Sequence, residues 1–301
     1  MKWGGACAII RAMRTAQEQQ EGFLPLQTTT RLLALAPWSG LFLLYLPVFF
    51  QLYRAWRIDP YYSHGILIPP VALLLFYLER QKLAGQSFAP PSGPPWWLGS
   101  SLFVYLLGAW ADFRFLMYLS FPLSVAGMIH YLYGRETLRA MAFPLGFLLF
   151  MVPIPYTIPL AIGFPLQTFS AKYASALVGL TGIPTWREGV NLFIPGFHFI
   201  VERGCSGLSS ILALLALAVL FTYFLPAASW PQRIFLWFSA FPIALVANVA
   251  RISAVILLGH FFGPVAAQGF YENFSGLVIF GLAFLMLYFS AWWLGCLRKE
   301  S

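Results

Sequence analysis

The chain has 301 residues, of which 60% are hydrophobic and 9% charged, and its mean hydropathy is +0.75. This composition excludes a water-soluble globular fold and predicts an all-α integral membrane protein. The formal net charge of +8 does not indicate nucleic-acid binding, because the basic residues are scattered among the loops between apolar segments. We expect them to set the orientation of the chain in the membrane.

Residues 1–30 form a basic, glutamine-rich segment that is not followed quickly enough by an apolar stretch to be a cleavable signal peptide. We expect a cytoplasmic tail here and a single transmembrane domain over residues 31–301. About eight transmembrane helices are predicted in it, near residues 33–52, 66–78, 97–111, 115–133, 138–155, 211–225, 234–258 and 276–294. Asp59-Pro60 predicts the start of the second helix, and the proline-rich residues 89–95 predict an extended linker after it.

Residues 156–204 form an insert in which proline and glycine recur and no apolar stretch is comfortably long enough to span a bilayer. Residues 157–180 predict one or two interfacial or re-entrant helices. Residues 189–194 and 197–201 alternate in polarity around Pro195-Gly196, which predicts a hairpin. This re-entrant and hairpin segment leads directly to Cys205.

Eight spans place both termini on the same side of the membrane, and eleven of the eighteen basic residues fall on that side. This bias favours cytoplasmic termini in a multi-pass protein of the cell (inner or plasma) membrane. With that orientation, the starts of spans two, six and eight and the end of span seven bring five polar residues near the outer face: His64, Cys205, Arg251, His260 and Asn273.

Cys205 follows Arg203-Gly204 and precedes the apolar residues 211–225. A helix N-terminus carries unpaired N–H groups and a partial positive charge, which favour a thiolate and make Cys205 a candidate nucleophile. Simple packing against neighbouring helices is the alternative for a membrane cysteine. The other cysteines, Cys7 and Cys296, lie near the chain ends and form no CxxC pair, so we expect neither a disulfide framework nor a metal or cofactor site.

Arg251 lies several residues inside an apolar span, with Asn248 one turn earlier on the same helix face. A guanidinium at such a position costs at least ~2.5 kcal/mol, so it needs a partner or a water-filled cavity. Snorkelling to the outer headgroups is the alternative. Near a cysteine, an arginine stabilises a thiolate or a developing oxyanion.

Several short motifs follow one another over about residues 59–280. They are Tyr62-Ser63-His64-Gly65, Pro153-Ile154-Pro155, Gly182-Ile183-Pro184, Arg187-Glu188-Gly189, Cys205-Ser206-Gly207-Leu208, Asn248-Val249-Ala250-Arg251-Ile252 and Gly259-His260. In order and spacing they resemble the exosortase/archaeosortase family of multispanning, transpeptidase-like enzymes.

The resemblance implies a membrane cysteine protease or transpeptidase acting at the outer face. Its substrates would be exported proteins with a C-terminal sorting signal, made of a recognition motif, a transmembrane helix and a basic cluster. Cys205 would form a thioester and pass the acyl group to an acceptor, Arg251 would stabilise the oxyanion or thiolate, and His260 would be the general acid/base. Residues expected to support the site or bind substrate are His64, Asn248, Asn273, Arg203 and Ser206.

Family members often carry a histidine before the last span, where this chain has Asn273, so His64 stays open as an alternative base to His260. On one unbroken helix, Arg251 and His260 would face opposite sides, ~13.5 Å apart along the axis. Gly259 before His260 and Gly263-Pro264 after it are residues that favour a helix end. We therefore predict that the seventh helix ends near Leu258 and that residues 260–274 fold back, bringing His260 toward Cys205. A different class stays open as well, a transporter or lipid-linked-glycan handling protein without peptidase activity.

Overall fold

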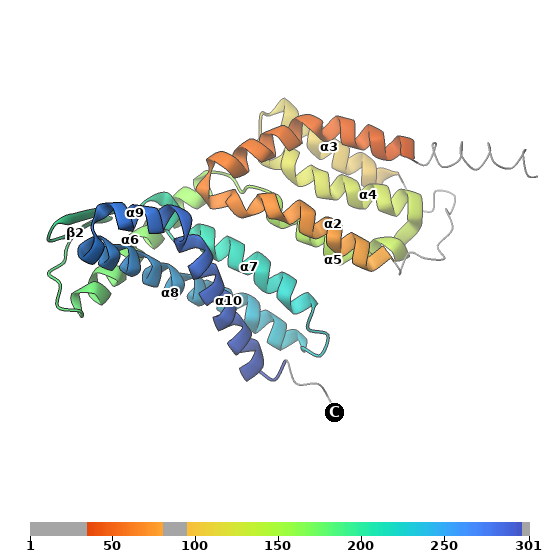
Figure 1. Ribbon diagram of the computed structural model, residues 1–301. Helices are drawn as coiled ribbons and strands as arrows, with labels where there is room; N and C mark the ends of the chain where they lie inside the picture. The colour runs from red at the N-terminus through yellow and green to blue at the C-terminus, as the bar shows by residue number, and fades with distance from the viewer. Residues whose placement is uncertain (1–34, 81–94, 297–301) are drawn as a thin grey trace, which may run out of the picture. The chain divides into compact units, whose positions relative to one another are not determined.

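The structure is a computed structural model that describes residues 35–80 and 95–296 (Figure 1). The predicted tail (residues 1–30), most of the predicted linker and Cys7 lie outside these described ranges. The chain divides into two units, Met1–Phe50 and Gln51–Ser301, and each is described by itself. The unit boundary falls within the first described helix, Leu35–Ile58.

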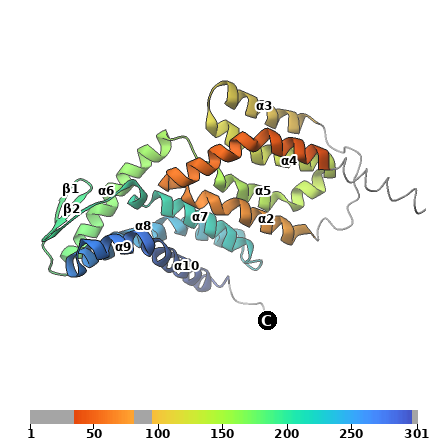
Figure 2. The same cartoon turned by 45° about the horizontal axis from the view of Figure 1, so that its top comes forward.

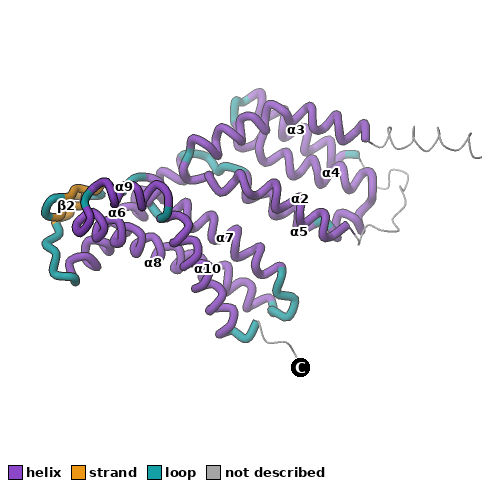
Figure 3. The backbone as a smooth tube through the Cα atoms, viewed as in Figure 1, coloured by secondary structure: helices purple, strands orange, loops and turns teal. Residues whose placement is uncertain are grey.

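The described part of the second unit is mainly helical, with a few short strands (Figure 3). After the end of the first helix, its elements are η1 (Pro60–Leu67), α2 (Ile68–Glu79), α3 (Trp96–Trp110), α4 (Arg114–Ala140), α5 (Ala142–Phe147), η3 (Leu148–Met151), α6 (Thr157–Gly179), β1 (Trp186–Glu188), β2 (Asn191–Ile194), β3 (Phe197–Ile200), η4 (Arg203–Cys205), α7 (Leu208–Tyr223), α8 (Trp230–Phe262), α9 (Pro264–Asn273) and α10 (Ser275–Trp293).

Among the described residues, five helices are long and apolar enough to cross a membrane: Leu35–Ile58, Pro60–Glu79, Arg114–Ala140, Trp230–Phe262 and Ser275–Trp293. They match five of the eight predicted spans, consistent with the all-α, multi-pass class expected from composition. The other predicted spans correspond to shorter helices, such as α3 with 15 residues and α7 with 16. The count of eight stays a prediction.

The second helix starts where its sequence indicates. The Asp59 side chain accepts a hydrogen bond from the Tyr61 backbone N–H at 3.0 Å, and Pro60 occupies the first position of η1. Gly65 within η1 packs so closely on Trp56 that a Cβ there would overlap the indole ring. This contact fixes the turn that carries His64.

The predicted hairpin is present as β2 and β3. The strands pair antiparallel with Ile194 opposite Phe197, and Gly196 in the connecting turn adopts φ +79°. A third strand, β1, pairs with β2, and its short Trp186-Arg187-Glu188 sequence carries no alternation that predicts it. Before the sheet, α6 is a single 23-residue helix, and its re-entrant character stays a prediction.

The predicted end of the seventh helix near Leu258 is wrong, because α8 runs without interruption to Phe262. Gly259 does not end the helix. A Cβ at Gly259 would lie 2.6 Å from the Phe197 ring, so this glycine lets β3 approach α8. The helix ends instead at Gly263, which has φ +86°, and Pro264 then starts α9.

Helix α8 is the central element of the second unit and packs against α6, α7, α9 and α10 (Figures 1 and 2). Its contact face is rich in buried small residues, including Ala240, Ala244 and Ala247, and α10 contributes Ala283 and Ala291 to the same core. Small residues let helix backbones approach closely inside a membrane, where van der Waals packing drives association. Helix α8 can therefore contact several neighbours at once.

Candidate active site

Cys205 closes the short helix η4 and lies three residues before the first residue of α7. Its side chain is 1% exposed and belongs to an apolar cluster with Val201, Ile252 and Ile256. Gly207, with φ +88°, turns the chain from η4 into α7. A side chain there would be strained in this left-handed conformation. The predicted placement of Cys205 just before a helix is therefore confirmed, with a tight turn between them.

Two side chains of α8 hold the backbone around the cysteine. Asn248 Nδ2 donates to the Cys205 carbonyl at 2.7 Å and to Ser170 Oγ at 2.9 Å. Arg251 Nη2 donates to the Gly204 carbonyl at 2.9 Å. Both residues therefore lie on one face of α8, as their spacing predicts, and Arg251 has a partner within the protein.

A residue that the sequence analysis did not single out lies against the sulfur. The Sγ atom of Cys205 and the hydroxyl of Tyr271, on α9, are joined by a 3.3 Å hydrogen bond. The Arg251 guanidinium carbon lies 6.0 Å from the Tyr271 ring centroid. Burial raises the pKa of Tyr271, with further contributions from Cys205 and Glu202 that Arg251 opposes. The phenol therefore keeps its proton near neutral pH.

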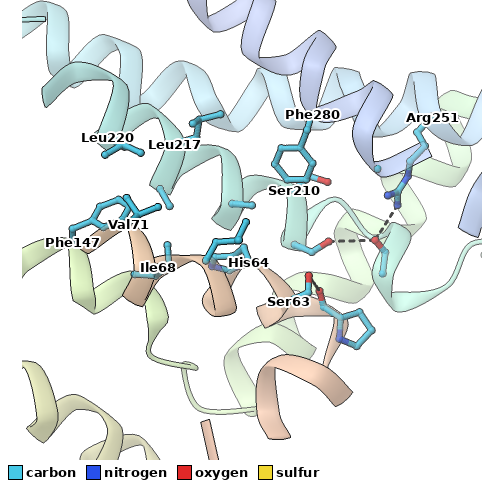
Figure 4. Close-up of a pocket in the computed structure, with 17 residues that line it drawn as sticks. Ser63, His64, Ile68, Val71, Phe147, Ser210, Leu217, Leu220, Arg251 and Phe280 are labelled. Atoms are coloured by element: carbon cyan, nitrogen blue, oxygen red, sulfur yellow. Dashed lines mark hydrogen bonds between the residues drawn. The ribbon is translucent and has the colours of Figure 1, made fainter. Parts of the chain in front are cut away.

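Beside this cluster lies a cavity of about 640 Å³ (Figure 4). Arg251 marks one end, and Phe147 and Leu220 mark the other. Its lining is mostly apolar: Pro60, Leu67, Ile68, Val71, Phe147, Ala213, Ala216, Leu217, Leu220 and Phe280, with Gly204, Gly276, Ser63, His64, Ser209, Ser210 and Arg251. The cavity reaches Gly204 but not the neighbouring Cys205.

Of the two candidate histidines, the structure brings His64 to this cavity. Its ring is hydrogen-bonded to the backbone of Phe150, and Nδ1 is buried with no partner among the described residues. The neighbouring Tyr62 hydroxyl donates to the Ile154 carbonyl at 3.0 Å. This bond holds η1 against the segment that contains Phe150 and Ile154.

His260 lies in the last turn of α8, in ring contact with Phe261. Nine residues of unbroken helix place it on the face opposite Arg251, ~13.5 Å further along the axis. The prediction that the fold-back carries His260 toward Cys205 is wrong, because His260 stays on the unbroken α8. Helix α9 does return against α8, but the side chain that it brings to the sulfur is Tyr271.

The remaining predicted site residues shape the surroundings. Arg203 Nη1 donates to the Tyr156 hydroxyl at 3.0 Å. Ser206 is fully buried, and its Oγ accepts a hydrogen bond from the Leu208 backbone N–H at 3.2 Å. Asn273 is the last residue of α9, and its side chain lies outside the described part of the structure. Within that part, no three His, Cys, Asp or Glu side chains gather where they could hold a metal ion.

In a comparison with known protein families, the chain matches the family described as transmembrane exosortase (Exosortase_EpsH) over residues 56–289. A search of curated proteins and a search of solved structures found no match. The matched region covers most of the chain and includes the cavity, Cys205, Arg251 and Tyr271. Family membership supports a membrane sorting transpeptidase in general terms. The chain belongs to the transmembrane exosortase family.

Proposed function

We propose that the chain is a membrane-embedded cysteine transpeptidase that cleaves the C-terminal sorting signals of exported proteins at the outer face. Cys205 forms a thioester with the exported protein, which is then transferred to an acceptor. The observation that carries the proposal is the convergence of Cys205, Arg251 and Tyr271 beside an apolar cavity that is lined by Arg251 and by Gly204, the neighbour of Cys205.

In the first step, Cys205 Sγ attacks the carbonyl carbon of the scissile amide. The new S–C bond forms, negative charge develops on the carbonyl oxygen, and the C–N bond then breaks. Arg251 is suited to stabilise that charge. Its Nη2 is bonded to Gly204, while its Nε has no partner among the described residues, so the guanidinium has a donor left over for an oxyanion.

The cavity supports an acyl donor whose cleavage site adjoins an apolar segment. Six α7 residues line it and recur at helical spacing along one face: Ser209, Ser210, Ala213, Ala216, Leu217 and Leu220. An apolar segment lying along this face, with its polar end at Arg251, would place the scissile bond near Gly204 and Cys205. A mostly apolar wall of this kind favours a hydrophobic chain over the polar solute of a transporter.

Cleavage can be tested by co-expression with exported proteins that carry candidate sorting signals, followed by mass spectrometry of the new C-terminus. Cys205→Ala should abolish processing with membrane insertion intact, because no other group in this site forms the acyl intermediate. Cys296→Ala, at a buried cysteine beyond α10, is the matched control and should process normally. A correctly processed C-terminus in the Cys205→Ala protein would overturn the proposal.

A further inference from the structure

Tyr271 is the titratable side chain that hydrogen-bonds the Cys205 sulfur in the described part of the structure. We propose that Tyr271 is a catalytic residue that relays the thiol proton of Cys205 to the leaving amine. This inference rests on the transpeptidase function proposed above. It assigns to a tyrosine the proton transfer that the family resemblance implies for a histidine.

The first support is geometric. With the thiol donating to the phenol oxygen at 3.3 Å, the phenol O–H is free to point elsewhere, since no other hydrogen bond to this hydroxyl is formed by the described residues. The ring is held by Phe199, edge-on at a centroid distance of 6.1 Å, and by Arg251. A Cβ on Gly204 would lie 4.0 Å from the hydroxyl oxygen, so the phenol lies close to the cavity end.

The charges around the phenol decide how it can act. Glu202 precedes η4, Arg251 comes from α8, and Cys205 itself is the third group that influences Tyr271. Arg203, which also lies on η4, donates a hydrogen bond to the Tyr156 hydroxyl. Because Tyr271 stays a neutral phenol, it does not act as a free phenolate base. It can accept one proton only while giving up another, which is what a relay does.

Every bond broken and every proton moved in this step is accounted for by Cys205, Tyr271 and the substrate. The Cys205 S–H bond breaks as a new O–H bond forms on Tyr271. The original Tyr271 O–H bond breaks as an N–H bond forms on the leaving amine. The S–C bond forms and the C–N bond breaks, so Tyr271 ends neutral and the products are a thioester and a neutral amine. When an amine acceptor attacks the thioester, the relay runs in reverse.

The histidines are less well placed for this transfer. His64 lines the cavity but has no hydrogen bond to Cys205, and His260 lies on the opposite face of α8 from Arg251. The matched test therefore exchanges the phenol for groups that differ in proton chemistry. Tyr271→Phe keeps the ring and removes the hydroxyl, while Tyr271→His changes the ring but supplies a group that can both accept and donate a proton.

We expect Tyr271→Phe to lower the processing rate by at least ~100-fold, the lower range for loss of a general acid/base. Tyr271→His should process faster than Tyr271→Phe. A packing role predicts the reverse order, because phenylalanine is closer in shape to tyrosine. The control Tyr288→Phe removes a hydroxyl from α10, away from the site, and should process normally. Near-normal processing by Tyr271→Phe, or less processing by Tyr271→His, would overturn the relay.

A substrate-free measurement separates this inference from the proposed function. Iodoacetamide alkylation of Cys205 is followed by mass spectrometry across pH, with Cys7→Ser and Cys296→Ser in the background. Once Cys205 is a thiolate, the phenol O–H can donate to the sulfur and stabilise it. Loss of this donor in Tyr271→Phe should therefore move the profile to higher pH, and Tyr288→Phe should leave it unmoved. A change in how easily iodoacetamide reaches Cys205 would multiply the alkylation rate by the same factor at every pH and would leave the midpoint of the pH profile in place. An unmoved Tyr271→Phe midpoint counts against the relay even if Cys205→Ala confirms the proposed function.

Discussion

At the scale of single residues, the candidate site depends on two α8 side chains that hold the backbone at Cys205, the proposed nucleophile. Asn248 is fully buried and bonds the Cys205 carbonyl, and Arg251 bonds the carbonyl one residue earlier. A buried polar group left without a partner costs about 1–3 kcal/mol, so these bonds satisfy groups that the apolar surroundings cannot. The same contacts fix the backbone of Gly204, which lines the cavity, and of its neighbour Cys205.

The role of Arg251 can be divided into charge and geometry. Lysine keeps the positive charge but loses the forked donors, so it cannot hold Gly204 and an oxyanion together. We expect Arg251→Lys to lose most processing activity, by about 10²-fold or more, as for loss of an oxyanion donor. Arg251→Ala should be at least as damaged. The rate of single-turnover cleavage is measured in detergent. Near-wild-type turnover by Arg251→Ala would show that Arg251 has no role in catalysis.

Substitution of the two histidines should have clearly different effects on processing activity. His64 lines the cavity, and its Nδ1 has no partner among the described residues. His260 lies on the face of α8 opposite Arg251. We expect His64→Ala to lower processing by up to about tenfold, the effect of one hydrogen bond to the donor peptide, and His260→Ala to process normally. The two variants are compared at equal membrane levels. If His260→Ala does not process substrate while His64→Ala processes normally, His260 is the general acid/base, as the family resemblance implies.

At the scale of elements, the contact between β3 and α8 determines where the segment before Cys205 lies. Gly259 permits this contact because its missing Cβ leaves room for the Phe197 ring. The hairpin is packed on α8 here, while the chain that leaves β3 runs through Val201 to η4. A small change at this contact should therefore alter the position of Cys205.

Gly259→Ala tests that contact. The added methyl group would meet the Phe197 ring at 2.6 Å, and forced overpacking of this kind costs about 1–3 kcal/mol. We expect a lower thermal unfolding midpoint in detergent. Gly281→Ala is the matched control, because a Cβ there meets nothing within 4 Å and alanine favours a helix. Adding Phe197→Ala to Gly259→Ala should recover part of the loss, and a strictly additive double variant would contradict the contact.

Sequence patterns predicted local features of the fold better than contacts between distant elements. The Asp59-Pro60 start and the Pro195-Gly196 turn follow from neighbouring residues, and both are present. Gly259 was interpreted as a helix end because a glycine's local preference says nothing about Phe197, sixty-two residues earlier. Tyr271 was missed for the same reason. It is one of fourteen tyrosines, and its contact with Cys205 depends on the return of α9.

At the scale of the whole molecule, the orientation proposed from the basic residues has a direct test. Cys205 is buried from a large, charged maleimide, unlike from the small, uncharged iodoacetamide, so exposed reporter cysteines are placed before and after α7 instead. In a background without native cysteines, Glu188→Cys on β1 should react with a membrane-impermeant maleimide added outside intact cells. Ala227→Cys, in the loop between α7 and α8, should react only after permeabilisation. Labelling of Ala227→Cys from outside would invert the proposed topology.

The length of α8 also has a consequence for where the reaction occurs in the bilayer. Its 33 residues extend about 50 Å, whereas the hydrocarbon layer is about 30 Å thick. With the exposed Trp230 at one interface, as is usual for tryptophan, about 21 residues of upright helix carry the chain ~32 Å to Arg251. Arg251 then lies level with the opposite headgroups, and the final turns with His260 project beyond them. In the proposed function, the scissile bond would then lie where an amine-bearing acceptor can approach from the water or from a lipid headgroup, without entering the hydrocarbon.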